Sequence, residues 1–537
     1  MIENKKKSVV VIGAGVSGLV SVKSCLEEGL DVRCYELTEC VGGLWKYRND
    51  SPENVSVLQK STIINSSKEM SAFSDFPPPS EYSNFMHNKM MWSYIDKYAS
   101  QFNLFPYIKL HHKVESCTKN KEGDKWIIKG FNVQTDEAWE DTADALMVCN
   151  GHLAKPKIPN IPGLKDFKGK VIHTRDYKHT TGFEDKNILV VGVGNSAGDA
   201  AVELSTVSNQ LYLCARTGTW VFSRVGKKGI PSDFQLSRLL NFFVNLAPSL
   251  TSTKLENDIN QKFDHKLFGL KPKHRVLEQH PVVNDDLPNR IISGRIKVKG
   301  GIDHVTKDSV YFVNDDTEYK IDVVVLGTGY LIDFPFLDDS ITGLNNSSNE
   351  VNLYKYIIPP KDPSIAIIGL LQPFGALTPL GEAQARWYVQ YLLGKLELPS
   401  CETMQADIDS TAKRMRQRFR TTSRYTLEVD FQPYLDDLHQ YLGTKPNLMK
   451  IFFEDPPLFW KMLVGPILPY QYRLKGPNKW EGARKAIMTV EDRMREPFSR
   501  KDENNDQKSR ESYMMLIVPV IFGIFSFYYL IELYNSI

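Results

Sequence analysis

Three short apolar runs recur along the chain, and each of them ends at a glycine-containing turn. They occupy residues 9–12, 188–191 and 323–326, before the turns GAGVSG, GVGNSAG and GTGY. Continuous Val/Ile runs are typical of buried parallel strands, so the pattern predicts an α/β fold. The first run ends in glycines instead of a small-residue cleavage site, which favours a strand over a signal peptide.

Two further stretches have apolar residues at helical spacing. Residues 234–250 are rich in leucine and aromatic side chains, and we interpret them as a packed helix pair within an insertion rather than as a catalytic element. Residues 379–396 form a predicted helix with proline in its first turn, a favoured place for proline. We expect this helix to pack back on the first unit.

The last apolar stretch, residues 512–531, contains no charged side chain. Twenty residues of helix span roughly 30 Å, the thickness of the hydrocarbon core of a bilayer. Tyrosines lie near both ends of the stretch, where interfacial aromatic residues belong. The alternative is a buried C-terminal helix, which would need partners on every face. We predict a transmembrane anchor, preceded by a polar tether.

Composition narrows the function classes. Of 537 residues, 42% are hydrophobic and 24% charged, as in ordinary globular proteins, and the net charge of +2 makes nucleic acid an unfavoured partner. The seven cysteines are scattered without a CxxC pair, and no HExxH occurs. We therefore predict neither a disulfide framework nor a metal site, and a reducing environment. The mean hydropathy of −0.32 suggests a soluble protein, an average that hides the apolar stretch at the end.

The first glycine turn has the form G-x-G-x-x-G, with Gly13, Gly15 and Gly18, and opens a helical pattern. Such a turn lets the backbone approach a pyrophosphate at a helix N-terminus. The next predicted strand, within residues 30–37, carries Glu36 near its end, where a carboxylate can accept hydrogen bonds from a ribose diol. A ligand-free glycine turn would not explain Glu36, so we predict an adenine dinucleotide site.

The second turn is the G-x-G-x-x-A variant, with Gly192, Gly194 and Ala197. Its following strand ends in Arg216 instead of an acid. A guanidinium can pair with a 2′-phosphate that a carboxylate would repel, so the expected ligand is NADPH rather than NADH. Arg224 is a second candidate phosphate partner, with a solvated surface arginine as the alternative.

Two dinucleotide sites in one chain imply two nucleotides that exchange electrons, so we expect a flavin at the first and the nicotinamide donor at the second. Residues 322–330 are expected to return the chain to the flavin domain, with their glycines against the cofactor.

Several segments then resemble the flavin-containing monooxygenases. FKGKVIHTRDY (Phe167, Gly169, His173 and Tyr177) matches the family signature before the second nucleotide fold. VGGLW (41–45), INSSKEM (64–70), GNSAGD (194–199) and YQYRLKGPNKWEGAR (470–484) also match, although Ala197 stands where many members carry glycine. The resemblance to the vertebrate-type, membrane-bound members covers essentially the whole chain.

The resemblance implies FAD and NADPH as cofactors. NADPH would reduce FAD, O2 would form a C4a-hydroperoxide, and small lipophilic amines or sulfides would be oxygenated at nitrogen or sulfur. The cofactor performs the bond changes while the protein orients and shields it. The predicted cofactor-binding residues are Gly13, Ala14, Gly15, Val16, Ser17, Gly18, Glu36, Gly43, Leu44, Trp45, Ile64, Asn65, Ser66, Gly192, Gly194, Asn195, Ser196, Ala197, Gly198, Asp199, Arg216 and Arg224.

Asn65 is the predicted catalytic residue, because the resemblance places it near the flavin N5 and the nicotinamide. A neutral amide donates and accepts hydrogen bonds without titrating, but a turn asparagine bonded to its own backbone is the common alternative. The resemblance implies that Trp45 lies against the flavin, and packing in the core is the alternative interpretation. His173 is interpreted as a structural residue of the linker to the NADPH domain, and the role of His152 stays open.

The predicted architecture is two interleaved Rossmann-like domains with a helical insertion. FAD-binding residues 1–154 and 331–445 enclose an NADPH-binding domain (155–330) that contains the insertion at about 225–288. Residues 446–511 form a C-terminal extension and tether, followed by the anchor (512–531). The resemblance implies an endoplasmic reticulum membrane location with a cytosolic catalytic domain, and both a monomer and a homo-oligomer are compatible with the sequence.

Three alternatives remain beside N- or S-oxygenation. A Baeyer–Villiger oxygenase of ketones is disfavoured by Tyr177, where that class usually has tryptophan. An NADPH oxidase that releases hydrogen peroxide would use the same sites. A degenerate, membrane-attached nucleotide-binding scaffold is disfavoured by the intact glycines, Glu36, Arg216 and Asn65.

Overall fold

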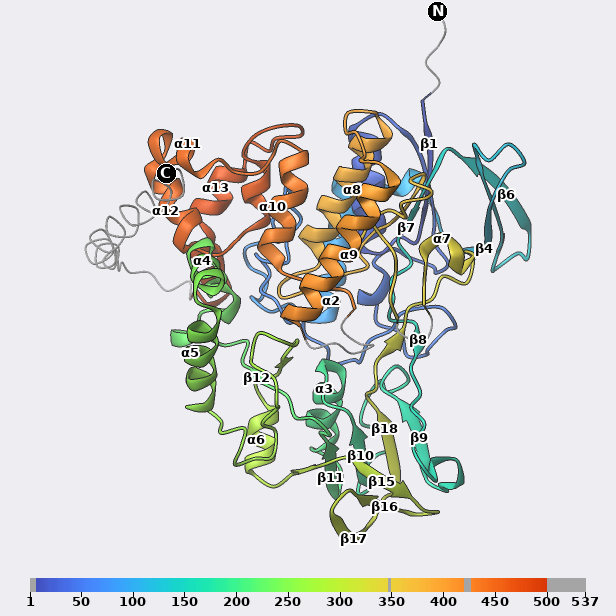
Figure 1. Ribbon diagram of the computed structural model, residues 1–537. Helices are drawn as coiled ribbons and strands as arrows, with labels where there is room; N and C mark the ends of the chain where they lie inside the picture. The colour runs from blue at the N-terminus through green and yellow to red at the C-terminus, as the bar shows by residue number, and fades with distance from the viewer. Residues whose placement is uncertain (1–5, 346–348, 420–425, 500–537) are drawn as a thin grey trace, which may run out of the picture. The chain divides into compact units, whose positions relative to one another are not determined.

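The computed structural model describes residues 6–345, 349–419 and 426–499. Its first parallel sheet has the strand order β20-β7-β1-β2-β3 (Figure 1). The strands are β1 (Ser8–Ile12), β2 (Asp31–Tyr35), β3 (Ile108–Lys109), β7 (Ala145–Val148) and β20 (Ile365–Ile367). The apolar run of residues 9–12 is fully buried in β1, which explains why it lacks polar alternation.

The second parallel sheet has the order β14-β11-β10-β18-β9. Its strands are β9 (Lys170–His173), β10 (Asn187–Val191), β11 (Gln210–Cys214), β14 (Ile296–Lys299) and β18 (Val323–Leu326). The second and third apolar runs are the neighbouring strands β10 and β18. The predicted α/β fold with Rossmann-like sheets is therefore confirmed.

The chain passes from the first sheet to the second and back again. It leaves after β7, and the next strand that joins the first sheet is β20, which pairs with β7 in parallel. The outgoing strand β8 (Lys155–Pro156) and the returning strand β19 (Tyr330–Leu331) form an antiparallel pair. The two sheets are thus joined by two adjacent crossings of the backbone.

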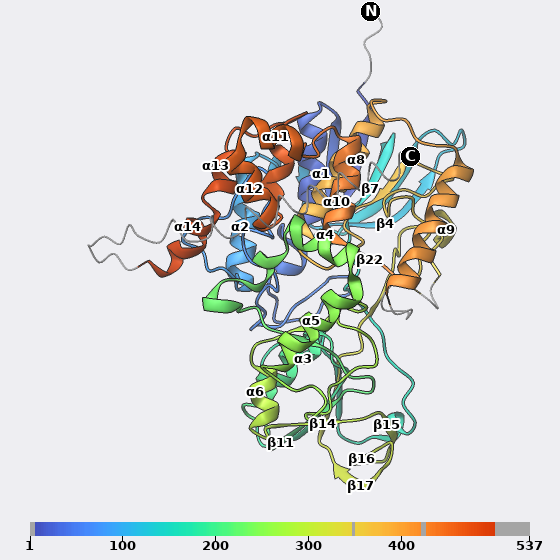
Figure 2. The same ribbon diagram turned by 60° about the vertical axis from the view of Figure 1, so that its left-hand side comes forward.

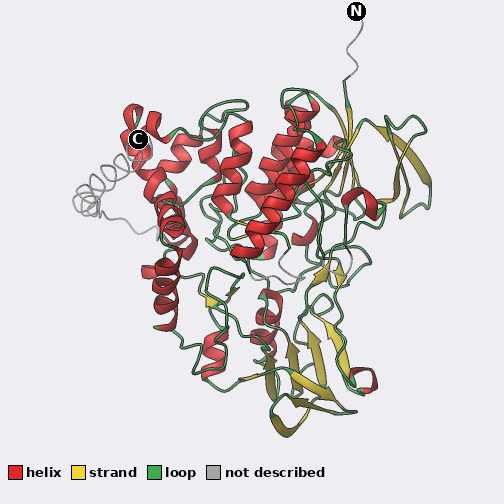
Figure 3. Ribbon diagram, in the orientation of Figure 1, coloured by secondary structure: helices red, strands yellow, loops and turns green. Residues whose placement is uncertain are grey.

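Each parallel sheet has a three-stranded antiparallel sheet inserted in the chain before one of its strands. Three antiparallel strands precede β7, namely β4 (His112–Lys119), β5 (Trp126–Asn132) and β6 (Ala138–Ala143). Three more precede β18, namely β15 (Ile302–Val305), β16 (Ser309–Phe312) and β17 (Asp315–Lys320). Figure 3 shows these antiparallel strands beside each parallel sheet.

Helices cover the sheets and close the core. Helix α1 (Val16–Glu27) follows β1 and contacts α8 (Thr378–Leu392), which begins with proline in its first turn and packs on α10 (Phe431–Tyr441). The predicted helix after residue 379 and its return to the first unit are therefore confirmed. The other helices are α2 (Asn88–Gln101), α3 (Asn195–Leu204), α6 (Leu287–Ile292), α7 (Asp339–Thr342), α9 (Cys401–Arg418), α11 (Leu448–Glu454), α12 (Pro456–Val464), α13 (Ala483–Met488) and α14 (Val490–Arg495).

Two consecutive helices, α4 (Arg238–Leu246) and α5 (Pro248–Asn260), occupy the apolar stretch that predicts a helix pair. They contact each other, and α4 also lies against α12 from the C-terminal part of the chain (Figures 1 and 2). The short strands β12 (Val221–Phe222) and β13 (Val282–Val283) pair on either side of this segment, and β21 (Gln372–Pro373) pairs with β22 (Glu428–Val429).

None of the helices within the described residues is long and apolar enough to cross a membrane. The predicted transmembrane anchor, residues 512–531, lies outside the described part of the chain.

Candidate functional site

A cavity of about 750 Å³ lies at the carboxyl ends of β1 and β2 and extends to the N-terminal turn of α3. This volume is within the range of small-molecule and cofactor sites. Fourteen of the predicted site residues line it: Gly13, Gly15, Val16, Ser17, Glu36, Gly43, Leu44, Trp45, Ile64, Asn65, Ser66, Asn195, Ser196 and Asp199. The cavity lining does not include Ala14, Gly18, Gly192, Gly194, Ala197, Gly198, Arg216 and Arg224.

Two positions of the first glycine turn require glycine because backbone carbonyl oxygens lie where a Cβ would stand. Gly13 has φ +97°, and a Cβ on it would lie 2.7 Å from the carbonyl oxygen of Cys149. A Cβ on Gly18 would lie 1.9 Å from the carbonyl oxygen of Gly13. Gly15 is different, because its nearest neighbour would be the Cα of Gly43 at an ordinary 3.7 Å. Gly15 therefore keeps the cavity open without being required by the protein's own packing.

Helix α1 begins at this turn with Gly15 as its N-cap, and no side chain caps it. The first amides of a helix have no partner within the helix, and they favour an anion. Glu36 lies beside the turn and is buried. One of its carboxylate oxygens accepts from the Ala14 amide at 2.6 Å, and the other accepts from the amide and hydroxyl of Thr38 at 2.9 and 2.7 Å. A carboxylate has about four acceptor positions, so Glu36 retains capacity for a ligand.

The second turn repeats this arrangement. Gly192 has φ +103°, and a Cβ on it would lie 2.5 Å from the carbonyl oxygen of Gly327. Gly194, the N-cap of α3, has no heavy atom within 4 Å of an added Cβ and an extended backbone that other residues also adopt. The second glycine of both motifs thus borders open space, which fits the close approach of a pyrophosphate.

Ala197, where many relatives of the resembled family have glycine, is accommodated by a glycine on the neighbouring strand connection. Its side chain is 1% exposed, and its Cβ lies 2.4 Å from the place a Cβ on Gly327 would take. Gly327 therefore packs against α3, and the cavity lining does not include it, in contrast to the expectation that the glycines of residues 322–330 border the cofactor. Tyr330, three residues later, lines the cavity.

Arg216 follows β11 and is exposed. Its aliphatic stem lies near Gly301, 3.5 Å from where a Cβ would be. Arg216 follows the carboxyl end of β11, which pairs with β10, the strand that leads into the second turn. This is the position from which an arginine reaches a ribose 2′-phosphate in such folds.

Arg224 lies beside the predicted catalytic residue. It is 9% exposed, so its interpretation as a solvated surface arginine is wrong. Its Nη2 donates to Asn65 Oδ1 at 2.7 Å, and its Nη1 lies 3.5 Å from Asp285 Oδ2. Asn65 therefore has a side-chain partner 159 residues away, in contrast to a turn asparagine that bonds only its own backbone.

Asp199 and His152 add titratable groups to the cavity wall. Burial raises the pKa of Asp199 to about 6, against the opposing charge of Arg224 and a hydrogen bond from Asn284 Nδ2 at 2.8 Å. Burial lowers the pKa of His152 to about 4, so its imidazole is neutral at pH 7. His173 Nε2 lies 3.1 Å from the carbonyl oxygen of Gly329 next to the β8–β19 crossing, which favours the linker role.

The cavity is also lined by segments that the sequence motifs do not identify, and two of them lie near the predicted site residues. One is the loop of residues 54–59, in which Gln59 Nε2 donates to the carbonyl oxygen of Ser196 at 2.9 Å. The other is the start of α8, with Leu377 and Thr378. Gly369 and Gly375, which precede this helix, also line the cavity, but two separate glycines form no motif that identifies the segment from the sequence.

Comparison with known proteins places these observations in a family. A family model described as flavin-binding monooxygenase-like matches residues 6–531. Flavin-containing monooxygenase 5 of Cavia porcellus is 42% identical over 528 residues, covering 96% of this chain and 98% of that protein. Dimethylaniline monooxygenase [N-oxide-forming] 2 of Mus musculus is 38% identical over 535 residues, covering 98% and 99%.

Solved structures share the fold at lower identity. The S-allyl-L-cysteine S-oxygenase from Allium sativum has a TM-score of 0.62 and 22% identity, over 84% of this chain and 94% of that one. An open cyclohexanone monooxygenase has a TM-score of 0.60 and 16% identity, over 84% and 98%.

Proposed function

Because this chain belongs to the flavin-binding monooxygenase-like family, we propose that it oxygenates soft nitrogen and sulfur atoms of small lipophilic compounds. It is an NADPH-dependent flavin monooxygenase whose cofactor is FAD. In the overall reaction NADPH supplies two electrons, one atom of O2 enters the substrate and the other leaves as water. FAD, when bound, supplies the electron transfer from NADPH to O2.

The observation that carries the proposal is the single cavity lined by the first glycine turn, Asn65 and the start of α3. We assign the FAD pyrophosphate to the N-terminus of α1 and its adenosine ribose to Glu36. NADPH is assigned to the N-terminus of α3 and to Arg216. The residues fit these groups because Gly194 leaves open space where a Cβ would stand, and Gly15 lines the cavity with no neighbour closer than 3.7 Å to an added Cβ.

The side chains of this site bind and orient more than they transfer protons. Arginine only donates hydrogen bonds, so the Asn65 oxygen faces Arg224 and the Asn65 amide hydrogens are left to face the cavity. A neutral amide can hold a reacting oxygen without acidifying it. The neutral His152 likewise adds no strong acid to the wall. Keeping water and stray protons out favours substrate oxygenation over release of hydrogen peroxide.

A substrate panel tests this proposal. The purified protein with NADPH in air is given a tertiary amine, a thioether and a ketone, and products and hydrogen peroxide are both quantified. We expect N-oxide and sulfoxide in amounts close to the NADPH consumed. Ester from the ketone alone would establish the Baeyer–Villiger alternative, and peroxide without any oxygenated product would establish the oxidase.

Asn65→Asp provides the matching residue test. A carboxylate beside Arg224 would pair with the guanidinium and lose the amide donor that faces the cavity. We expect the fraction of NADPH electrons recovered as product to fall and the peroxide fraction to rise, with NADPH binding retained. An unchanged product fraction would remove Asn65 from the catalytic role.

We also propose that residues 512–531 anchor the protein in the endoplasmic reticulum membrane, with residues 1–154 and 331–445 binding FAD and 155–330 binding NADPH. The uncharged length of the C-terminal stretch supports the anchor. A chain that ends at residue 511 is then expected to leave the membrane fraction. Full retention of the shortened chain after a wash at high salt and alkaline pH would argue against a single C-terminal anchor.

A further inference from the structure

The segment of residues 64–75 begins with the Asn65 region and ends beneath α8, and much of what holds it comes from the far end of the chain. The C-terminal extension, described over residues 446–499, contributes three groups of contacts to this segment and to Asn84. Asn84, whose carbonyl oxygen accepts from the Lys68 amide at 2.7 Å, donates its own side-chain amide to the carbonyl oxygen of Met494 at 3.1 Å.

Glu69 is the central point of contact. It is fully buried, and both of its hydrogen-bond donors belong to the extension. Tyr470 donates its hydroxyl to Oε2 at 2.7 Å, and Arg493 donates Nε to Oε1 at 2.9 Å. Burial raises the pKa of Glu69, while Arg493 and Tyr470 act in the opposite direction.

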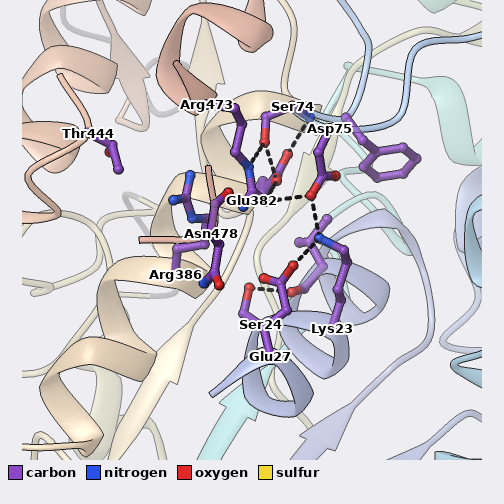
Figure 4. A network of polar contacts seen from close by, with 12 residues as sticks. Lys23, Ser24, Glu27, Ser74, Asp75, Glu382, Arg386, Thr444, Arg473 and Asn478 are labelled. Atoms are coloured by element: carbon purple, nitrogen blue, oxygen red, sulfur yellow. Dashed lines mark hydrogen bonds and ion pairs between the residues drawn. The ribbon is translucent and has the colours of Figure 1, made fainter. Parts of the chain in front are cut away.

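The end of the segment is held in the same way. Figure 4 shows Arg473 of the extension reaching Ser74, Asp75 and Glu382. Arg473 Nε donates to Ser74 Oγ at 2.6 Å, and its Nη2 lies 2.7 Å from Glu382 Oε1 and 3.1 Å from Asp75 Oδ2. Arg473 is 1% exposed, so these contacts replace solvation completely.

Most of the charges are divided between the two parts of the chain. The segment and α8 supply the carboxylates Glu69, Asp75 and Glu382, and the extension supplies the arginines at positions 473 and 493. Asp75 also pairs with Lys23 of α1 at 2.7 Å. A buried carboxylate that loses its partner is strongly unfavourable, so the extension restricts where the buried Glu69 and Glu382 can lie. A compact turn transmits this toward Asn65: the Ser71 amide donates to the Ser67 carbonyl oxygen at 2.9 Å, and the hydroxyls of Ser66 and Ser71 lie 2.6 Å apart.

We propose that Tyr470 and Arg493, acting through Glu69, are positioning residues for Asn65, so that the C-terminal extension sets the geometry of the oxygenation site. The inference rests on the proposed function, because Asn65 is the group that it positions. Neither positioning residue lines the cavity, so both act at a distance from the reacting atoms.

Arg493→Gln tests the proposal, with Arg495→Gln as the matched control. Both arginines are on α14. Arg495 is exposed, and its ion pair with the exposed Asp492 is long, at 3.9 Å. Arg493 instead pairs with the buried Glu69 at 2.9 Å. The first readout is hydrogen exchange of the 64–75 amides, measured by mass spectrometry on the purified full-length protein. We expect exchange at least about threefold faster in Arg493→Gln and unchanged exchange in Arg495→Gln.

The second readout is the peroxide fraction with a thioether substrate, per bound flavin. Arg493→Gln should raise it at least about threefold with little change in the KM for NADPH. In an Asn65→Ala background, Arg493→Gln should not raise the peroxide fraction further, because Arg493 and Asn65 act on the same step. Tyr470→Phe removes one hydroxyl and keeps the packing, so we expect smaller increases in the exchange rate and in the peroxide fraction. It replaces Arg493→Gln as the test if that variant does not fold.

The possible outcomes distinguish a failure of the proposed function from a failure of the positioning role. A native protein that gives no oxygenated product with NADPH would refute the proposed function. A native protein that oxygenates normally, with an Arg493→Gln variant that keeps the exchange rates and peroxide fraction of the control, would refute the positioning role. A peroxide increase of equal size with and without Asn65 would also refute it.

Discussion

Asn65 and Arg224 are far apart in sequence, yet their contact determines what the catalytic candidate presents to the cavity. The sequence identifies Asn65 only through the resemblance, and it leaves Arg224 as a candidate phosphate partner. No local pattern predicts a contact across 159 residues, because it depends on the tertiary fold. Glu36 could be predicted from spacing, since its position follows from the strand–helix–strand geometry.

Arg216 is expected to select NADPH over NADH. Arg216→Ala removes an exposed guanidinium, and a charged hydrogen-bonded pair with phosphate contributes enough for about a tenfold increase in the KM for NADPH. The KM for NADH should change little, because NADH has no 2′-phosphate. Steady-state kinetics with both nucleotides checks this, and Arg216→Lys, which keeps the charge, should lie between. Equal increases for both nucleotides would contradict the assignment.

Asp233, in the insertion, is a carboxylate that folding makes harder to ionise. It accepts from the Ser67 amide at 2.6 Å, and burial raises its pKa to about 6. Because the pKa is higher in the folded protein, the carboxyl group ionises at a lower pH in the unfolded chain than in the folded protein. Its contribution to stability is therefore present below pH 4 and lost between about pH 4 and 6.

Asp233→Asn removes this pH dependence. Relative to the native protein, the variant should gain stability as the pH rises from 5 to 8, by about 1.4 kcal/mol, because roughly one pKa unit of the shift lies above pH 5. Thermal unfolding of both proteins at the two pH values measures the difference. A constant difference in Tm between the proteins would show that Asp233 titrates normally.

At the scale of elements, the two glycine turns differ in which glycines the protein itself requires. Gly13 and Gly192 have left-handed backbones against carbonyl oxygens, whereas Gly15 and Gly194 have room for a Cβ. The glycine pattern in the sequence predicts both turns correctly but does not separate these two causes. The start of α8, which also lines the cavity, could not be predicted as part of the site because it reaches the first sheet only through tertiary packing.

Gly194→Ala should leave Tm without nucleotide within about 1 °C of the native value, because the added methyl meets no atom within 4 Å. NADPH binding should weaken about tenfold, since the methyl would stand where the pyrophosphate approaches. Gly192→Ala is the matched comparison and should lower Tm, because φ is +103° there and the Cβ meets a carbonyl oxygen. Unchanged NADPH affinity in Gly194→Ala would place the nucleotide elsewhere.

At the scale of the whole molecule, the apolar runs predict buried strands but not their order. That β20 joins the first sheet beside β7, after the chain has built the second sheet, depends on long-range pairing. The same holds for the C-terminal extension, in which Arg473 pairs with Asp75 and Arg493 pairs with Glu69, far earlier in the chain. The sequence marks the extension by its resemblance, and only the fold brings it against the Asn65 segment.

The central claim is that one chain uses NADPH and O2 to insert a single oxygen atom into a soft nucleophile. Incubation with NADPH, a thioether and isotopically labelled O2 in unlabelled water tests it most directly. The account predicts a sulfoxide that carries one labelled oxygen atom, in an amount close to the NADPH consumed. Unlabelled sulfoxide, or sulfoxide that disappears when catalase removes free hydrogen peroxide, would contradict it.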